Sequence, residues 1–217
     1  MLRKITRWVL FTLVFCGGIL AMSGDWTSPL LWTYLAGVSA VFFYALMSLD
    51  PELARERFNP PGPGADAGAL LWIRITALAA LIVTVADMRF RWSAPVPVSL
   101  RIVGIVGSLS AFLFCFRAML TNRFFSPVIR IQEERGHRVV DAGPYAVIRH
   151  PGYAGMIVGV PLMPVALGSW WGSAIASVYA LLILNRVRVE DRFLRANLPG
   201  YVEYASRVRS RLVPGIW

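Results

Sequence analysis

The sequence predicts an all-α, polytopic transmembrane helical bundle that forms a single integral membrane domain over residues 1–217. Charged residues make up only 16% of the chain and hydrophobic residues 57%, whereas a soluble domain carries about 25% charged residues. The mean hydropathy is +0.59. Apolar runs recur along the chain, and a transmembrane helix needs about 20 mostly apolar residues. We therefore expect about six membrane segments, of which the last two form a tight helical hairpin.

The first four membrane segments are expected within residues 1–120, joined by loops. They are the apolar runs 8–22, 29–49, 69–86 and 98–120. The first run follows Arg3 and Lys4, and a basic start before a short apolar run is also typical of a signal peptide. Because residues 21–23 (Ala-Met-Ser) fit a small–x–small cleavage site poorly, we expect this first helix to be retained.

The last two segments are expected within residues 121–217, as a membrane hairpin over 151–185. These 35 residues carry no charge, and a single helix of that length would span about 52 Å, against a bilayer core of about 30 Å. Gly168 and Ser169 lie near the middle, where a turn is easy. We expect Pro161 and Pro164 to bend the first helix. The second should continue past the bilayer into residues 186–194, and a cytoplasmic C-terminal helix should follow.

The distribution of basic residues predicts the orientation. The chain has 22 Lys and Arg against 12 Asp and Glu, a net charge of +10. With six segments, every basic residue except Arg89, Arg91 and Arg101 falls on the side that holds both termini. The positive-inside rule then places both termini in the cytoplasm, and we expect a bacterial inner membrane. This topology accounts for the basic excess, so we expect no nucleic-acid partner.

Cysteine and histidine are used in a way that does not favour a metal site. Cys16 and Cys115 both lie inside apolar runs, which favours packing over a zinc site or a disulfide framework. The two histidines, His137 and His150, have no nearby cysteine and no helical i,i+4 spacing. We expect no metal.

The hairpin brings two charged stretches to one face of the membrane. Arg149 and His150 precede its first helix, and Arg186, Glu190 and Asp191 follow in its second. Arg186 and Glu190 are four residues apart and share one helix face. Such a cluster suits a zwitterionic ligand, but it equally suits ion pairs that anchor helix ends. Spacing alone leaves both interpretations open.

The stretch GPYAVIRHPGYAG at 143–155 resembles the signature of the isoprenylcysteine carboxyl methyltransferase family. The resemblance continues in the spacing of Arg186, Glu190 and Asp191, and in LPGYVEY at 198–204. Residues 50–57, 122–126 and 132–137 resemble the bacterial branch. Specific likeness covers roughly residues 110–217.

The resemblance implies S-adenosylmethionine as methyl donor, bound in a pocket at the cytoplasmic face. The donor-binding residues that it implies are Tyr145, Arg149, His150, Pro151, Tyr153, Gly155, Arg186 and Glu190. Glu190 would bind the ribose hydroxyls or the ammonium group, and Arg149 and Arg186 are candidates for the donor's carboxylate. Asp191 stands where the family commonly has a second glutamate, and its shorter side chain leaves its contact with the donor open.

A carboxylate is the favoured acceptor, on a lipophilic small molecule, lipid or prenylated substrate that enters from the bilayer. A carboxylate is already ionised at pH 7, and an arginine can hold it through two hydrogen bonds. Arg117 is the candidate catalytic residue, because a charge within a membrane segment is a functional hypothesis by default. Family enzymes use an arginine from this helix, but Phe114 also fits the equivalent place, and Arg117 could simply snorkel.

Three other functions stay open. A phospholipid or other lipid amine methyltransferase resembles the same signature, and integral-membrane sterol reductases resemble the C-terminal architecture while using a nicotinamide cofactor. A non-catalytic assembly or transport protein is the alternative from another class. The chain shows no repeated halves of the kind that transporters have.

Overall fold

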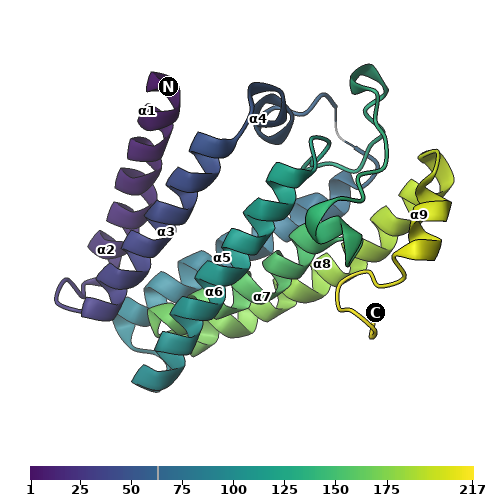
Figure 1. The fold of residues 1–217 in the computed structure, drawn as a ribbon. Helices are drawn as coiled ribbons and strands as arrows, with labels where there is room; N and C mark the ends of the chain where they lie inside the picture. The colour runs from purple at the N-terminus through teal and green to yellow at the C-terminus, as the bar shows by residue number, and fades with distance from the viewer. Residues whose placement is uncertain (63) are drawn as a thin grey trace.

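The computed structural model describes residues 1–62 and 64–217, in which all regular secondary structure is helical (Figure 1). The elements are α1 (Leu2–Phe11), η1 (Thr12–Cys16), α2 (Gly17–Ser23), α3 (Pro29–Ser48), α4 (Pro51–Phe58), α5 (Ala67–Phe90), α6 (Val98–Thr121), η2 (Glu133–Arg135), η3 (Gly143–Ala146), α7 (Pro151–Leu167), α8 (Trp170–Asn197) and α9 (Tyr201–Arg207).

The predicted all-α membrane bundle is confirmed. Within residues 1–62 and 64–217, five helices are long and apolar enough to cross a membrane, with α1, η1 and α2 counting as one continuous helix, Leu2–Ser23. The others are α3, α5, α6 and α8. The sixth apolar segment, α7, has 17 residues, about 26 Å at 1.5 Å per residue. The chain is an integral, multi-pass membrane protein.

The hairpin turns at the predicted residues. Gly168 ends α7 in the left-handed region with φ 94°, which favours glycine. Ser169 caps α8 by accepting the backbone N–H of Gly172 at 2.9 Å. Its hydroxyl donates to Asp87 at 2.5 Å, so the turn is tied to the end of α5. The second helix continues to Asn197, past the uncharged run.

Helices α6 and α7 approach each other closely through small residues. A Cβ on Gly155 would lie 2.5 Å from the carbonyl oxygen of Ala111, and one on Gly104 would lie 2.6 Å from the backbone nitrogen of Ala166. Bare glycine surfaces let two backbones meet, and within a membrane such van der Waals packing is a main source of helix association. This contact fixes the position of α7, whose N-terminal end carries the signature residues.

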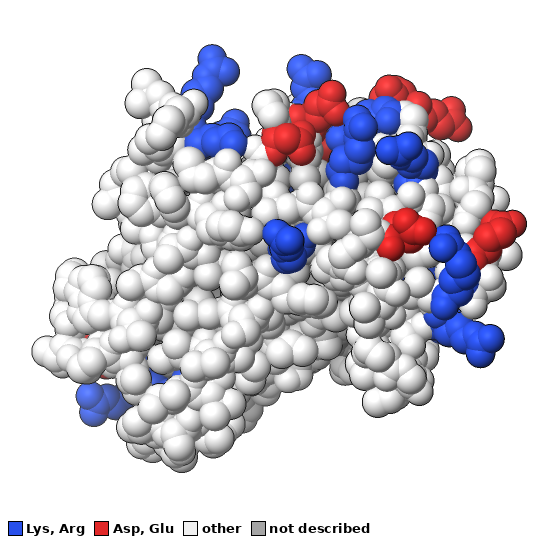
Figure 2. Space-filling view, viewed as in Figure 1, with Lys and Arg blue, Asp and Glu red and all other residues white. Residues whose placement is uncertain are grey.

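Charged side chains gather toward one end of the molecule. On the face in Figure 2, Lys, Arg, Asp and Glu crowd the upper and right-hand parts, and a broad region below them is nearly free of charge. The upper end of the same view in Figure 1 holds the start of α1, α4 and the loops after α6. The molecule thus has the charge segregation that the sequence predicts, although its orientation in a membrane stays a prediction.

Candidate functional site

A cavity of about 480 Å³ lies where the loop after α6 meets α7 and α8. Its walls come from α4, the first half of α5, the segment 122–140, η3, the start of α7, α8 from Tyr179 onward, and α9. Small-molecule sites commonly measure about 300–1,000 Å³. The cavity is therefore large enough for a ligand of cofactor size.

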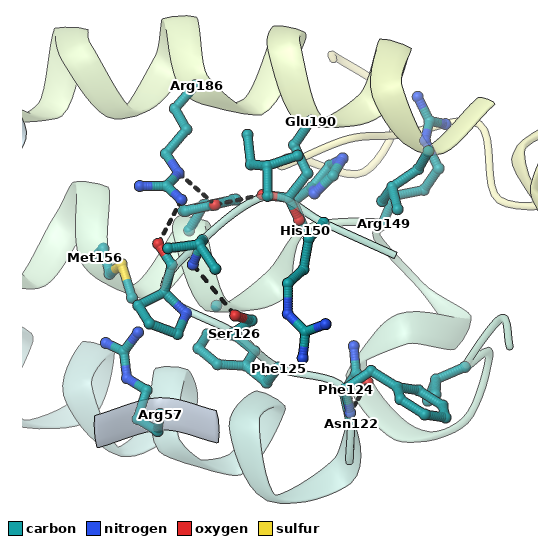
Figure 3. Close-up of a pocket in the computed structure, with 18 of the residues that line it drawn as sticks. Arg57, Asn122, Phe124, Phe125, Ser126, Arg149, His150, Met156, Arg186 and Glu190 are labelled. Carbon is teal, nitrogen blue, oxygen red and sulfur yellow. Dashed lines mark hydrogen bonds between the residues drawn. The ribbon is translucent and has the colours of Figure 1, made fainter. Parts of the chain in front are cut away.

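A chain of hydrogen bonds links α7 and α8 at the cavity wall (Figure 3). The Tyr153 hydroxyl donates to Glu190 Oε2 at 2.5 Å, and Arg186 Nε donates to the Tyr153 oxygen at 2.9 Å. Because Arg186 and Glu190 are one turn apart, both lie on the face of α8 that meets Tyr153. In the described chain, no side chain or backbone group donates to the other Glu190 oxygen, Oε1.

The donors of Arg186 bind groups of the protein itself. Besides Tyr153, its guanidinium donates to the carbonyl of Pro127 at 2.6 Å and lies 3.1 Å from a carboxylate oxygen of Asp66. Both Arg186 and Asp66 are buried. This arginine clamps the loop after α6 and the start of α5 onto α8, so it shapes the cavity more than it offers free donors to a ligand.

Asp191 is the centre of a second cluster, on the side of α8 that meets the C-terminal segment. Its side chain is 0% exposed. Five side chains contact its carboxylate: Arg149 at 2.8 Å, Tyr201 and Arg211 at 3.1 Å, Arg195 at 3.2 Å and His150 at 3.4 Å. Arg149 Nη1 donates to the carbonyls of Val208 and Arg209. For Asp191 and Arg149, the structure shows the anchoring ion pairs that the sequence left open.

The structure brings most, but not all, of the expected site residues together. Those that line the cavity are Tyr145, Arg149, His150, Tyr153, Arg186 and Glu190. Pro151, the first residue of α7, is not part of the lining, and Gly155 faces α6 instead. Arg117 lies on an exposed side of α6, outside the lining. The roles expected for these residues stay predictions.

Sequence reasoning missed Arg57, which reaches the cavity from α4 (Figure 3). Its neighbour Glu56 docks α4 on the loop after α6, because Glu56 accepts from Arg130 at 2.7 Å and from Ser126 at 2.6 Å. Burial alone would raise the pKa of Glu56, but these hydrogen bonds hold it below its ordinary value. The family-like stretch 50–57 was the available signal, but nothing in it points to a cavity.

The cavity-lining His137 is expected to be neutral near pH 6. Burial, aided by the charges of Arg130 and Arg135, lowers the pKa of His137 from 6.5 to about 4. The unfolded chain then binds more protons than the folded chain between these values, so stability is lost as the pH falls through this window. His137 Nδ1 accepts the backbone N–H of Gln132 at 3.3 Å, an acceptor that asparagine can replace.

His137→Asn is therefore expected to reduce the loss of stability on the acid side. The measurement is the thermal midpoint of the detergent-purified protein between pH 6.5 and about 4. If the thermal midpoint of the variant fell as far as that of the wild type over this range, His137 would not titrate as its surroundings indicate.

Comparison with known proteins finds similarity over the part of the chain that holds most of the site. Residues 102–196 match the model of the isoprenylcysteine carboxyl methyltransferase (ICMT) family. This stretch runs from α6 nearly to the end of α8 and contains Arg117 and every residue expected to bind the donor. Arg57 lies outside it.

Among the individual relatives, two plant proteins are named as isoprenylcysteine methyltransferases and a bacterial protein carries a different name. Protein-S-isoprenylcysteine O-methyltransferase B of Arabidopsis thaliana is 34% identical over 96 residues, which cover 41% of this chain and 46% of that protein. A probable protein-S-isoprenylcysteine O-methyltransferase of Oryza sativa is 34% identical over 97 residues, 42% of this chain and 49% of the relative. The cobalt-zinc-cadmium resistance protein CzcN of Cupriavidus metallidurans is 27% identical over 121 residues, 54% of this chain and 49% of the relative. The chain spans about half the length of these curated relatives.

Proposed function

We propose that the chain is an S-adenosylmethionine-dependent methyltransferase, because residues 102–196 match the model of the isoprenylcysteine carboxyl methyltransferase family. It acts at the membrane on a lipophilic acceptor, and the acceptor group is a carboxylate, in keeping with the names of the family and of the plant relatives. The active site faces the cytoplasm of a bacterial cell, with both termini on the same side of the inner membrane. The basic residues that gather at the end of the molecule with α4 and the loops after α6 support this orientation.

The residues of the cavity fit the donor. Glu190 keeps one carboxylate oxygen without a donor among the described residues, at a wall where Tyr153 and Arg186 fix its position. A carboxylate held in this way suits the ribose hydroxyls or the ammonium of S-adenosylmethionine. On one side of Glu190, the lining residues Leu198, Tyr201 and Tyr204 belong to an apolar cluster that suits an adenine ring. This free oxygen of Glu190 is the observation that carries the proposal.

In this proposal, the chain's own residues orient the donor and the acceptor and remove water from around them. Bound S-adenosylmethionine supplies a methyl group on a sulfonium, and its transfer to a carboxylate gives a methyl ester and S-adenosylhomocysteine without release of a proton. No general base is needed, since the acceptor is ionised at pH 7. Arg186 holds the loop after α6 against α8, and in this proposal that wall helps to keep water away from the reacting groups. An amine acceptor would in addition need a group that takes up its proton.

Calorimetric titration of S-adenosylmethionine into the detergent-purified protein tests the proposal. The wild type is expected to bind saturably, and Glu190→Gln is expected to bind about 10- to 100-fold more weakly, the cost of losing a hydrogen bond to a charged group. Glu133→Gln, an exposed carboxylate outside the cavity, is the matched control and should bind like the wild type. A folded wild type that does not bind the donor would overturn the proposal.

A further inference from the structure

Arg57 differs from the other arginines that line the cavity. Three of those are paired: Arg130 with Glu56, Arg149 with Asp191 and Arg186 with Asp66. Arg74 and Arg138 are exposed. Arg57 is partly buried, yet its guanidinium makes no hydrogen bond or ion pair within residues 1–62 and 64–217. A cation in this position has lost part of its hydration without gaining an anion in return.

Arg57 packs on an aromatic ring, and the cation of Arg186 also lies close enough to act on its charge. The guanidinium carbon of Arg57 lies 5.6 Å from the centre of the Phe125 ring. That ring in turn packs on Gly152, where a Cβ would lie 2.5 Å from a ring carbon. Burial lowers the pKa of Arg57, although a guanidinium remains protonated in proteins. The charge is therefore present and faces the cavity (Figure 3).

Arg57 is held by a rigid support. Asp50 caps α4 by accepting the backbone N–H of Leu53 at 2.9 Å. Leu53 is 1% exposed and packs with Leu49 and Met119, while Glu56 is bound to Arg130. The helix is thus fixed at its start, its buried side and its end. A guanidinium on such a support loses little further freedom when it binds a ligand.

Next to Arg57, the cavity has an apolar wall that differs from the one beside Tyr201. The lining residues Ile73, Met156, Tyr179 and Ile183 belong to one hydrophobic cluster that includes parts of α5, α7 and α8. This wall lies among membrane helices. A ligand that fills it and also meets Arg57 needs an apolar chain with an anionic head.

We propose that Arg57 binds the carboxylate of the methyl acceptor, while the acceptor's apolar chain lies against the cluster of Ile73, Met156, Tyr179 and Ile183. The planar guanidinium can hold both carboxylate oxygens through two parallel hydrogen bonds. This inference rests on the proposed function and deepens it. Arg57, which lines the cavity, thereby takes the role of carboxylate binding that the sequence predicted for Arg117.

Binding of carboxylates and of their neutral amides tests this role. The probes are N-acetyl-S-farnesylcysteine and palmitate, each compared with its carboxamide, on the detergent-purified protein without donor. The wild type is expected to prefer both carboxylates by about 10-fold or more. Arg57→Gln is expected to abolish the preference, and Arg57→Lys to keep part of it. Arg55→Gln, an exposed arginine on the same helix outside the cavity, is the control that should keep all of it.

Three results would overturn the assignment: a wild type with no preference for carboxylates, a preference that survives in Arg57→Gln, or one that is lost in Arg117→Gln instead. Donor affinity, measured separately, is expected to stay within about twofold in Arg57→Gln, since the proposed ligand of Arg57 is the acceptor. A large loss of donor affinity in this variant would place the donor's carboxylate at Arg57 and also reject the inference. Failure of the wild type to bind the donor would instead reject the methyltransferase proposal, whatever the carboxylate preference.

Discussion

Asp191→Asn is expected to destabilise the protein by about 3–5 kcal/mol, the usual cost of removing one partner from a buried ion pair. The side chains of Asp191 and Arg149 are 0% and 2% exposed, so the variant leaves a buried guanidinium without its anion. Arg195, Arg211 and Tyr201 lose the same acceptor. The free energy of unfolding, measured by titration with sodium dodecyl sulfate, checks this expectation.

The control for the Asp191→Asn variant is Glu203→Gln. Glu203 lies on α9 and is exposed, so its neutralisation is expected to change stability by less than about 0.5 kcal/mol. If Asp191→Asn cost no more than this control, the Asp191 cluster would not be the anchor of the C-terminal segment.

Gly155→Ala is expected to cost about 1–3 kcal/mol through overpacking. The added Cβ would lie 2.5 Å from the Ala111 carbonyl oxygen and 2.8 Å from the Cys115 Cβ. The oxygen belongs to the backbone and cannot rotate away, so α7 must shift from α6. Because Tyr153 lies half a turn before Gly155, donor affinity should fall together with stability.

Gly68→Ala is the matched control for this contact. Gly68 lies in the first turn of α5, and a Cβ added there would meet no atom within 4 Å. A helical alanine is favoured over glycine by about 1 kcal/mol. The same detergent titration should show this variant to be at least as stable as the wild type. If Gly155→Ala and Gly68→Ala changed stability equally, α6 and α7 would pack less closely than the structure shows.

The hairpin could be predicted from sequence because its cause is local. An uncharged run too long for one span, with Gly168 and Ser169 near its middle, leaves few alternatives. The first helix was harder, since Arg3, Lys4 and Arg7 interrupt the apolar pattern and hid its true start at Leu2. The helix continues through them, and Lys4 donates to the carbonyls of Met47 and Leu49 at the end of α3.

The site could be predicted only where the relevant residues are close in sequence or fall in the family signature. Glu190 and Asp191 are neighbours, yet about 100° of helical rotation separates them. One faces the cavity and the other the C-terminal segment. Arg57 enters the cavity from α4, far from the signature in sequence. Its position depends on the packing of Glu56 against Arg130, which no local pattern encodes.

The two-residue turn between α7 and α8 has a consequence for biogenesis. No ionised group lies in residues 151–185, so no charge has to be carried across the bilayer when this part of the chain is inserted. Alone, α7 is short, and Pro161 and Pro164 remove two of its backbone donors. Ser173 on α8 donates to the Pro161 carbonyl at 3.0 Å. The pair is therefore suited to enter the membrane as one unit, and a charge placed in the turn would impair insertion before it affected any chemistry.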